Sequence, residues 1–186
     1  ITAGNPDLKS SFAHNFDLMG EYYFKSVGLL SVGGFYKKIN DFIYDYRDQS
    51  FTYDRFSELF PDLPNSLVPG QNYTLLYPKN GESVNVYGFE VALQRQLDFL
   101  PGFLKNFGVY VNYTYTKSEA KGIYNADGDL RKGLMLPGTA PHMFNSSLSW
   151  ENKRFSARIS LNHTAAYLDE LGGGDFEDRY YDKQTF

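Results

Sequence analysis

Hydrophobic and polar residues alternate with a period of two in six segments of the chain. This spacing predicts β-strands, because successive side chains of a strand point to opposite faces of a sheet. In residues 107–118, valines and aromatic rings form one face, while asparagine and threonine form much of the other. The six predicted strands cover residues 12–24, 28–38, 83–97, 107–118, 144–151 and 154–162.

The connections between these predicted strands alternate between short and long. The short ones are Lys25-Ser26, residues 98–106 and Asn152-Lys153, and the long ones cover residues 40–82, 119–141 and the Gly-rich stretch beyond Tyr167. Up-and-down outer-membrane barrels have short periplasmic turns and long extracellular loops, whereas a soluble sandwich has no reason to sort its loops in this way. The pattern therefore predicts an all-β, antiparallel up-and-down transmembrane barrel whose first strand starts on the extracellular side.

Six strands are too few to close such a barrel. Closed bacterial barrels have about eight strands or more, and an open sheet edge cannot face lipid because its backbone groups would be unpaired. We therefore expect residues 1–186 to form one partial barrel domain of a larger barrel. The run Arg179-Tyr180-Tyr181-Asp182-Lys183 predicts the beginning of a further strand.

The composition agrees with a barrel and excludes other classes. Aromatic residues make up 18% of the chain, with 16 Tyr and 16 Phe, and barrels place such residues in girdles at both membrane interfaces. No segment approaches the roughly 20 apolar residues of a transmembrane helix, and the mean hydropathy is −0.45. The net charge of −4 gives no electrostatic reason to expect nucleic acid as a partner. The absence of cysteine excludes disulfides and thiolate metal sites.

The sequence contains no recognisable catalytic or metal-binding motif. His14, His142 and His163 lie in or beside different predicted strands, and no Ser/His/Asp or Cys/His set accompanies them. The run Asn125-Ala126-Asp127-Gly128-Asp129 has leucine at both positions where a calcium loop needs glycine and glutamate, so it predicts a turn, with a weak cation site built from loop carboxylates as the alternative. We therefore expect neither an enzyme nor a cofactor or metal site.

Two groups of residues are candidates for function. The predicted loop at residues 40–82 is rich in aromatic rings, which bind ligands at small entropic cost. An equally supported alternative is that these rings pack the loop on itself around a short helix near residues 53–60. The extracellular candidates for contact with a small-molecule substrate are Tyr46, Phe51, Tyr53, Tyr73, Tyr77, Tyr124, Asp127, Asp129 and Arg131. The candidates for the lumen wall, on the polar faces of strands, are Glu90, Asn112 and Arg158. For Glu90, an ion-paired wall residue is the alternative to a ligand contact.

Four runs, taken in order, resemble the late barrel region of TonB-dependent outer-membrane receptors. The first is Gly4-Asn5-Pro6-Asp7-Leu8-Lys9 with His14-Asn15-Phe16-Asp17-Leu18 and Glu21-Tyr22-Tyr23-Phe24. The others are Gly34-Phe35-Tyr36-Lys37-Lys38-Ile39-Asn40-Asp41-Phe42-Ile43, then Tyr87-Gly88-Phe89-Glu90, then Leu136-Pro137-Gly138-Thr139-Ala140-Pro141-His142-Met143-Phe144-Asn145. The resemblance implies a 22-stranded barrel in outer-membrane lipid, filled by a plug domain and energised by the TonB complex. It also implies import of a scarce solute, such as a siderophore or other metal chelate or an oligosaccharide. The plug and the final strands of the family pattern are not found within these residues.

Two other functions remain open from the residues themselves. A passive porin-type barrel would have an open lumen and no plug domain. A soluble all-β glycan-binding module would bury Phe107, Val109 and Val111 against a second sheet.

Overall fold

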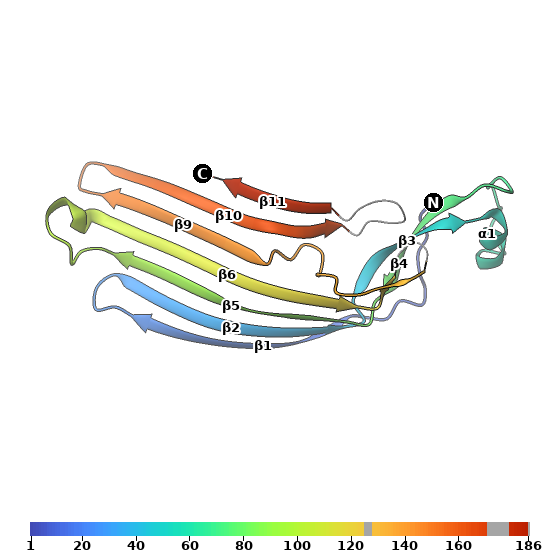
Figure 1. The fold of residues 1–186 in the computed structure, drawn as a ribbon, viewed down its shortest axis with the longest axis horizontal. Coiled ribbons are helices and arrows are strands. Elements are labelled where there is room, and N and C mark those ends of the chain that lie inside the picture. Colours follow the sequence, from blue (N-terminus) through green and yellow to red (C-terminus); the bar gives the residue numbers. More distant parts are fainter. Residues whose placement is uncertain (125–127, 171–178, 186) are drawn as a thin grey trace.

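The computed structural model describes residues 1–124, 128–170 and 179–185. Its largest element is one curved antiparallel sheet of seven strands in the order β1-β2-β5-β6-β9-β10-β11 (Figure 1). These strands are β1 (Phe12–Tyr23), β2 (Gly28–Asn40), β5 (Ser83–Gln96), β6 (Phe107–Lys121), β9 (His142–Glu151), β10 (Ser156–Glu170) and β11 (Arg179–Thr185). All six predicted strands are confirmed, and the further strand expected near residue 179 is β11. The sheet is open, since β1 and β11 are its two outer strands and do not pair with each other.

Short turns gather at one end of the sheet and long segments at the other (Figure 1). We call these the short-turn end and the long-loop end. At the short-turn end, Phe24 N–H donates to Gly28 O over 3.0 Å, and a short 3₁₀ helix, η1 (Gly102–Asn106), joins β5 to β6. The β9–β10 turn is fixed by the Asn152 side chain, whose Oδ1 accepts from the backbone N–H groups of Arg154 and Phe155. The predicted sorting of the loops is therefore confirmed.

The long-loop end carries the remaining elements. They are β3 (Ile43–Phe51), α1 (Tyr53–Leu59), β4 (Tyr73–Asn80), β7 (Ile123–Tyr124) and β8 (Leu130–Arg131). β3 pairs with β4, and β7 pairs with β8. The helix confirms the one expected near residues 53–60, but the two strand pairs lie where we had expected loops. Among the described residues, no helix is long and apolar enough to cross a membrane.

The registers from β1 to β9, and along β10 as far as Thr164, assign the residues of the large sheet to one of two faces. Leu93 lies opposite Val111, which lies opposite Ser146, and Ser146 lies opposite Leu161. Residues directly opposite each other share a face, so this row belongs to one face, which we call the outward face. Its large apolar side chains are exposed, for example Leu18 at 82% and Ile159 at 71%.

The other face, here called the inward face, is polar and better covered. It carries the buried β6 side chains Thr114, Thr116 and Ser118. Phe107, Val109 and Val111 lie on the outward face and are only partly covered. No second sheet encloses them among the described residues, so the two-sheet core required by a soluble glycan-binding module is not formed.

The outward face has chemically distinct boundaries at its two ends. Towards the long-loop end, the row Phe16, Tyr36 and Tyr87 is followed by the polar row His14, Lys38 and Asn85. Eight residues of β2 separate Tyr36 from Gly28, or about 27 Å along the strand, which corresponds to about 20 Å of depth at a tilt of about 40°. This depth is near the roughly 25 Å apolar band of outer-membrane barrels.

The boundary at the short-turn end is made by cation–π and aromatic contacts. The Arg95 guanidinium lies 4.1 Å from the ring centroid of Phe24 and 5.3 Å from that of Phe99. Trp150 Nε1 donates to Phe103 O over 3.1 Å. Amphipathic side chains of this kind sit where one end is apolar and the other is wet.

Candidate functional site

The β3–β4 pair arises from a short stretch of strict alternation. Tyr44, Tyr46 and Asp48 are buried, while the residues between them, such as Asp45 and Arg47, are exposed. This period of two is typical of a strand with one covered face. In the register of the pair, Tyr46 lies opposite Tyr77, and their ring centroids are 5.4 Å apart in an edge-to-face arrangement.

The β3–β4 pair is anchored to the inward side of the large sheet. Phe42, Tyr44 and Tyr46 belong to a buried apolar cluster that also contains Val84 and Ala120. Val84 and Ala120 lie opposite each other, on the inward face at the long-loop end. The aromatic face of β3 therefore packs against the inward face of the large sheet at its long-loop end, and not against the apolar outward face.

The N-terminal residues cover the other edge of β4. Thr2 forms a parallel bridge with Leu76, whose N–H donates to Ile1 O and whose carbonyl accepts from Ala3 N–H. Further along, Asn80 Oδ1 accepts from Lys9 N–H over 2.8 Å, and Asn80 Nδ2 donates to Lys9 O over 3.0 Å. Both edges of β4 are thus paired, which fixes the side chains that it presents.

Lys79 is held between two tyrosine rings. Its ammonium nitrogen lies 4.9 Å from the ring centroid of Tyr46 and 4.6 Å from that of Tyr124. Burial raises the pKa of Tyr44 above its ordinary value of 10.0, although the hydrogen bond that its hydroxyl accepts from Tyr124 N–H opposes this rise. Burial likewise raises the pKa of Tyr77 above 10.0.

A pocket of about 370 Å³ lies beside this cluster. Its apolar lining comes from Phe42, Ile43, Tyr44, Ile123, Leu136 and Pro137, and its charged lining from Asp45, Arg47 and Asp169. β3, β7, the segment before β9 and the end of β10 all contribute to it. Convergent polar groups on an apolar lining are the general composition of a small-molecule site.

The three candidates for the lumen wall share one face of the large sheet. The registers place Glu90, Asn112 and Arg158 on the inward face, in β5, β6 and β10. Glu90 also lines a hollow of about 350 Å³. The other residues around this hollow are Asn15, Asp17, Phe35, Tyr36, Lys37 and Val86. The inward face therefore carries carboxylates, amides and cations.

The comparison with known families agrees with this geometry. The family described as TonB dependent receptor-like, beta-barrel matches residues 1–185. The chain belongs to this family. Comparison with curated proteins gives no match. TonB-dependent receptors are outer-membrane transport proteins and not enzymes. Outer-membrane barrels turn an apolar band towards lipid and carry their long loops on the extracellular side.

The receptor structure brings together some of the expected substrate residues and separates others. Tyr46 and Tyr124 both contact Lys79, and Tyr77 packs against the ring of Tyr46. Phe51, Tyr53 and Tyr73 lie at the far end of the β3–β4 pair, next to α1 or within it. Phe51 is fully buried, so a ligand could not touch it without opening the pair.

Of the remaining expected residues, the structure describes Asp129 and Arg131, which lie next to β8 and within it. Arg131 pairs with Ile123, and Asp129 precedes β8. Asp127 lies outside the described residues. Among the residues that are described, no group of three or more His, Cys, Asp or Glu side chains is placed to hold a metal ion.

Sequence reasoning missed the charged residues of the 370 Å³ pocket. Asp45 and Arg47 carried a usable signal, because they alternate with Tyr44 and Tyr46 in the pattern of a strand. Asp169 carried none, since only the folding of β10 beyond its predicted end brings it to β3.

Proposed function

We propose that this chain forms part of the wall of an energised outer-membrane importer and that its extracellular aromatic cluster contacts the incoming solute. The observation that carries the proposal is the 370 Å³ pocket beside the inward mouth of the barrel wall. Its volume is in the range of sites for small ligands, about 300–1,000 Å³. The pocket lies on the side of the wall through which an imported solute has to pass.

The lining of the pocket favours a solute with both apolar and polar surfaces. Tyr44 and Phe42 offer ring faces, while Asp45, Arg47 and Asp169 offer charged hydrogen-bonding groups. Siderophores and other metal chelates, and also oligosaccharides, combine such surfaces. These remain the two substrate classes of the proposal.

Membership of the TonB-dependent receptor family favours an energised receptor over a passive porin. The family implies a plug domain and interaction with the TonB complex in the full protein. On this proposal, the carboxylates and cations of the inward wall, such as Glu90 and Lys37, face the plug and the solute path.

Uptake measurements in cells that make the full receptor test this proposal. A panel of labelled ferric chelates and oligosaccharides is offered to cells carrying the unaltered receptor, Arg47→Ala or Asp169→Ala. Loss of one charged hydrogen bond predicts a tenfold to hundredfold fall, as an order of magnitude, in apparent affinity for one solute class. Glu58→Ala, on the exposed surface of α1, is the matched control and should leave uptake unchanged.

The dependence of uptake on TonB separates the two transport mechanisms. Uptake should stop in cells that lack TonB. Uptake that continues at the same rate without TonB would identify a passive barrel and contradict the proposal. Unchanged affinity in both pocket variants would remove the pocket from the solute path.

A further inference from the structure

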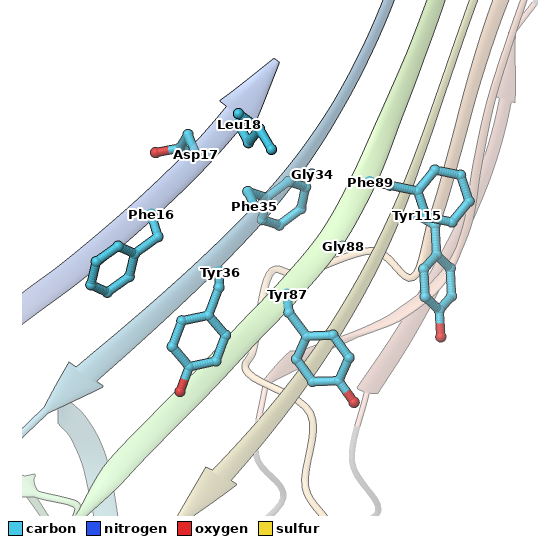
Figure 2. Close-up of a pocket in the computed structure, with 10 residues that line it drawn as sticks. All are labelled: Phe16, Asp17, Leu18, Gly34, Phe35, Tyr36, Tyr87, Gly88, Phe89 and Tyr115. Carbon is cyan, nitrogen blue, oxygen red and sulfur yellow. The ribbon is translucent and has the colours of Figure 1, made fainter. Parts of the chain in front are cut away.

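A second concave site lies on the opposite, lipid-facing side of the sheet (Figure 2). It has a volume of about 530 Å³, and we call it the Gly34 hollow. The rings of Phe16, Tyr36 and Tyr87 project in one row from β1, β2 and β5 (Figure 2). In the next row, Gly34 lies between Leu18 and Phe89. Because Gly34 has no side chain, the hollow opens between these two apolar residues.

Packing does not require a glycine at this position. A β-carbon built on Gly34 would meet only the backbone oxygen of Gly88, at an ordinary contact distance of 3.8 Å. The contrast is Gly88, where a β-carbon would overlap the carbonyl oxygen of Tyr115 and lie 2.7 Å from the Phe35 ring. Close approach of the neighbouring backbone therefore explains why residue 88 is a glycine. At residue 34, the absence of a side chain instead leaves the Gly34 hollow open towards lipid.

Cationic side chains lie on the extracellular side of the Gly34 hollow. Lys117 continues the row of Tyr36 and Tyr87, and Lys38 is two residues beyond Tyr36 on the same face. Both lysines are exposed. Lys38 is four residues from Gly34, or about 13 Å along the strand. Glu119 is the nearest carboxylate on this face by register, so the two ammonium groups leave an excess of positive charge.

We propose that the Gly34 hollow seats an acyl chain of an anionic, phosphorylated lipid of the extracellular leaflet, whose phosphate is bound by Lys38 and Lys117. The inference rests on the family's lipid-facing surface and is independent of the transported solute. Charge complementarity favours this occupant over a second copy of the chain. Two copies in one membrane, related by a two-fold axis along its normal, would place like-charged lysines at the same depth and near each other.

Native mass spectrometry of the full receptor, released from nanodiscs, measures this lipid directly. The nanodiscs contain equal amounts of phosphatidylcholine and phosphatidic acid, and the retained lipid is counted for each variant. Gly34→Val fills the hollow and should lower retention of phosphatidic acid about tenfold, because the chain loses contact with roughly two methylene groups' worth of surface. Lys38→Gln and Lys117→Gln should each lower it about fivefold.

Matched controls keep folding and charge separate from binding. Gly20→Val introduces the same side chain on the same outward face, where only Val32 O lies within 4 Å of the new β-carbon. Lys153→Gln removes the same charge at the short-turn end. Both should retain phosphatidic acid like the unaltered receptor. Gly34→Ala, which fits without a clash, provides a milder variant if Gly34→Val folds poorly, as judged by heat-modifiable gel migration.

Three outcomes would overturn the proposal. The first is equal retention by the unaltered receptor and by every folded Gly34 variant, which would show that the hollow does not hold the chain. The second is equal retention of phosphatidylcholine and phosphatidic acid by the unaltered receptor, which would show that no phosphate is recognised. The third is a dimer that Gly34→Val dissociates, which would assign the hollow to a second copy of the chain.

Discussion

A single arginine placed on the outward or the inward face of β6 should have very different consequences. Val111 lies on the outward face, opposite Leu93 and Ser146, whereas its neighbour Asn112 lies on the inward face, opposite Ala92 and Asn145. Along β6, Val111 is four residues from Phe107 and six from Lys117, or about 13 Å and about 20 Å. Val111 is therefore near the middle of the apolar band, where a cation is most costly.

The magnitude follows from the depth of this position. An arginine that faces lipid at the midplane costs about 2–4 kcal/mol, which corresponds to a change of about 30-fold to 1,000-fold in the folding equilibrium. Asn112→Arg adds the same charge to a face that already carries polar side chains and Arg158. Its cost should therefore stay within about 0.5 kcal/mol, as for ordinary surface substitutions.

Two measurements on the full receptor check this difference. The yield of heat-modifiable receptor in the outer membrane should fall sharply for Val111→Arg and remain normal for Asn112→Arg. Urea unfolding of the receptor in lipid vesicles should show a lower midpoint for Val111→Arg alone. Leu161→Arg, in the same register row, should behave like Val111→Arg. Equal losses on the two faces would refute the assignment of the lipid-facing surface.

Two further predictions concern backbone packing and titration. Gly88→Ala should lower the unfolding midpoint by the equivalent of about 1–3 kcal/mol, because its β-carbon would overlap the Tyr115 carbonyl; Gly34→Ala is the control, and equal midpoints would contradict the reason given. Burial raises the pKa of Tyr44 above 10.0. The contribution of the neutral Tyr44 side chain to the free energy of unfolding is therefore complete below pH 10.0 and is lost as the pH rises through the folded-state pKa. A spectrophotometric difference titration between the receptor and Tyr44→Phe should have its midpoint above pH 10.0, and a midpoint below that value would be inconsistent with burial as the cause.

The strands of the wall could be predicted from the sequence because each has one lipid-facing and one polar face. Apolar and polar residues keep alternating wherever a strand has both a lipid-facing side and a polar side, as in β6. The prediction was wrong at the C-terminal end of β10, which continues to Glu170 although the predicted strand ended at Asn162. The pairing of β10 with β11 shifts register between Thr164 and Tyr167, and such an irregularity interrupts the alternation that sequence patterns depend on.

The candidate site could be predicted only in part because its contacts are long-range. The run from Tyr44 to Asp48 has the local pattern of a strand, but the length of residues 40–82 favoured a loop. β4, its partner, follows more than twenty residues later, and α1 lies between them. Asp169 reaches the pocket that Arg47 also lines because β10 packs against the segment before β9, where Gly138 N–H donates to Leu168 O. No local pattern encodes that contact.

Gly34 and Gly88 have different roles that the sequence pattern alone does not distinguish. In sequence, Gly34 and Gly88 are both glycines inside predicted strands, a position that often marks close approach of another backbone. The structure gives this role to Gly88 alone, because only there would a side chain meet the neighbouring backbone. Gly34 tolerates a β-carbon and yet has none, so its effect is on the surface that faces lipid. A valine at Gly34 should therefore leave the strand intact, as β-branched residues favour strands, and change only what the outward face can bind.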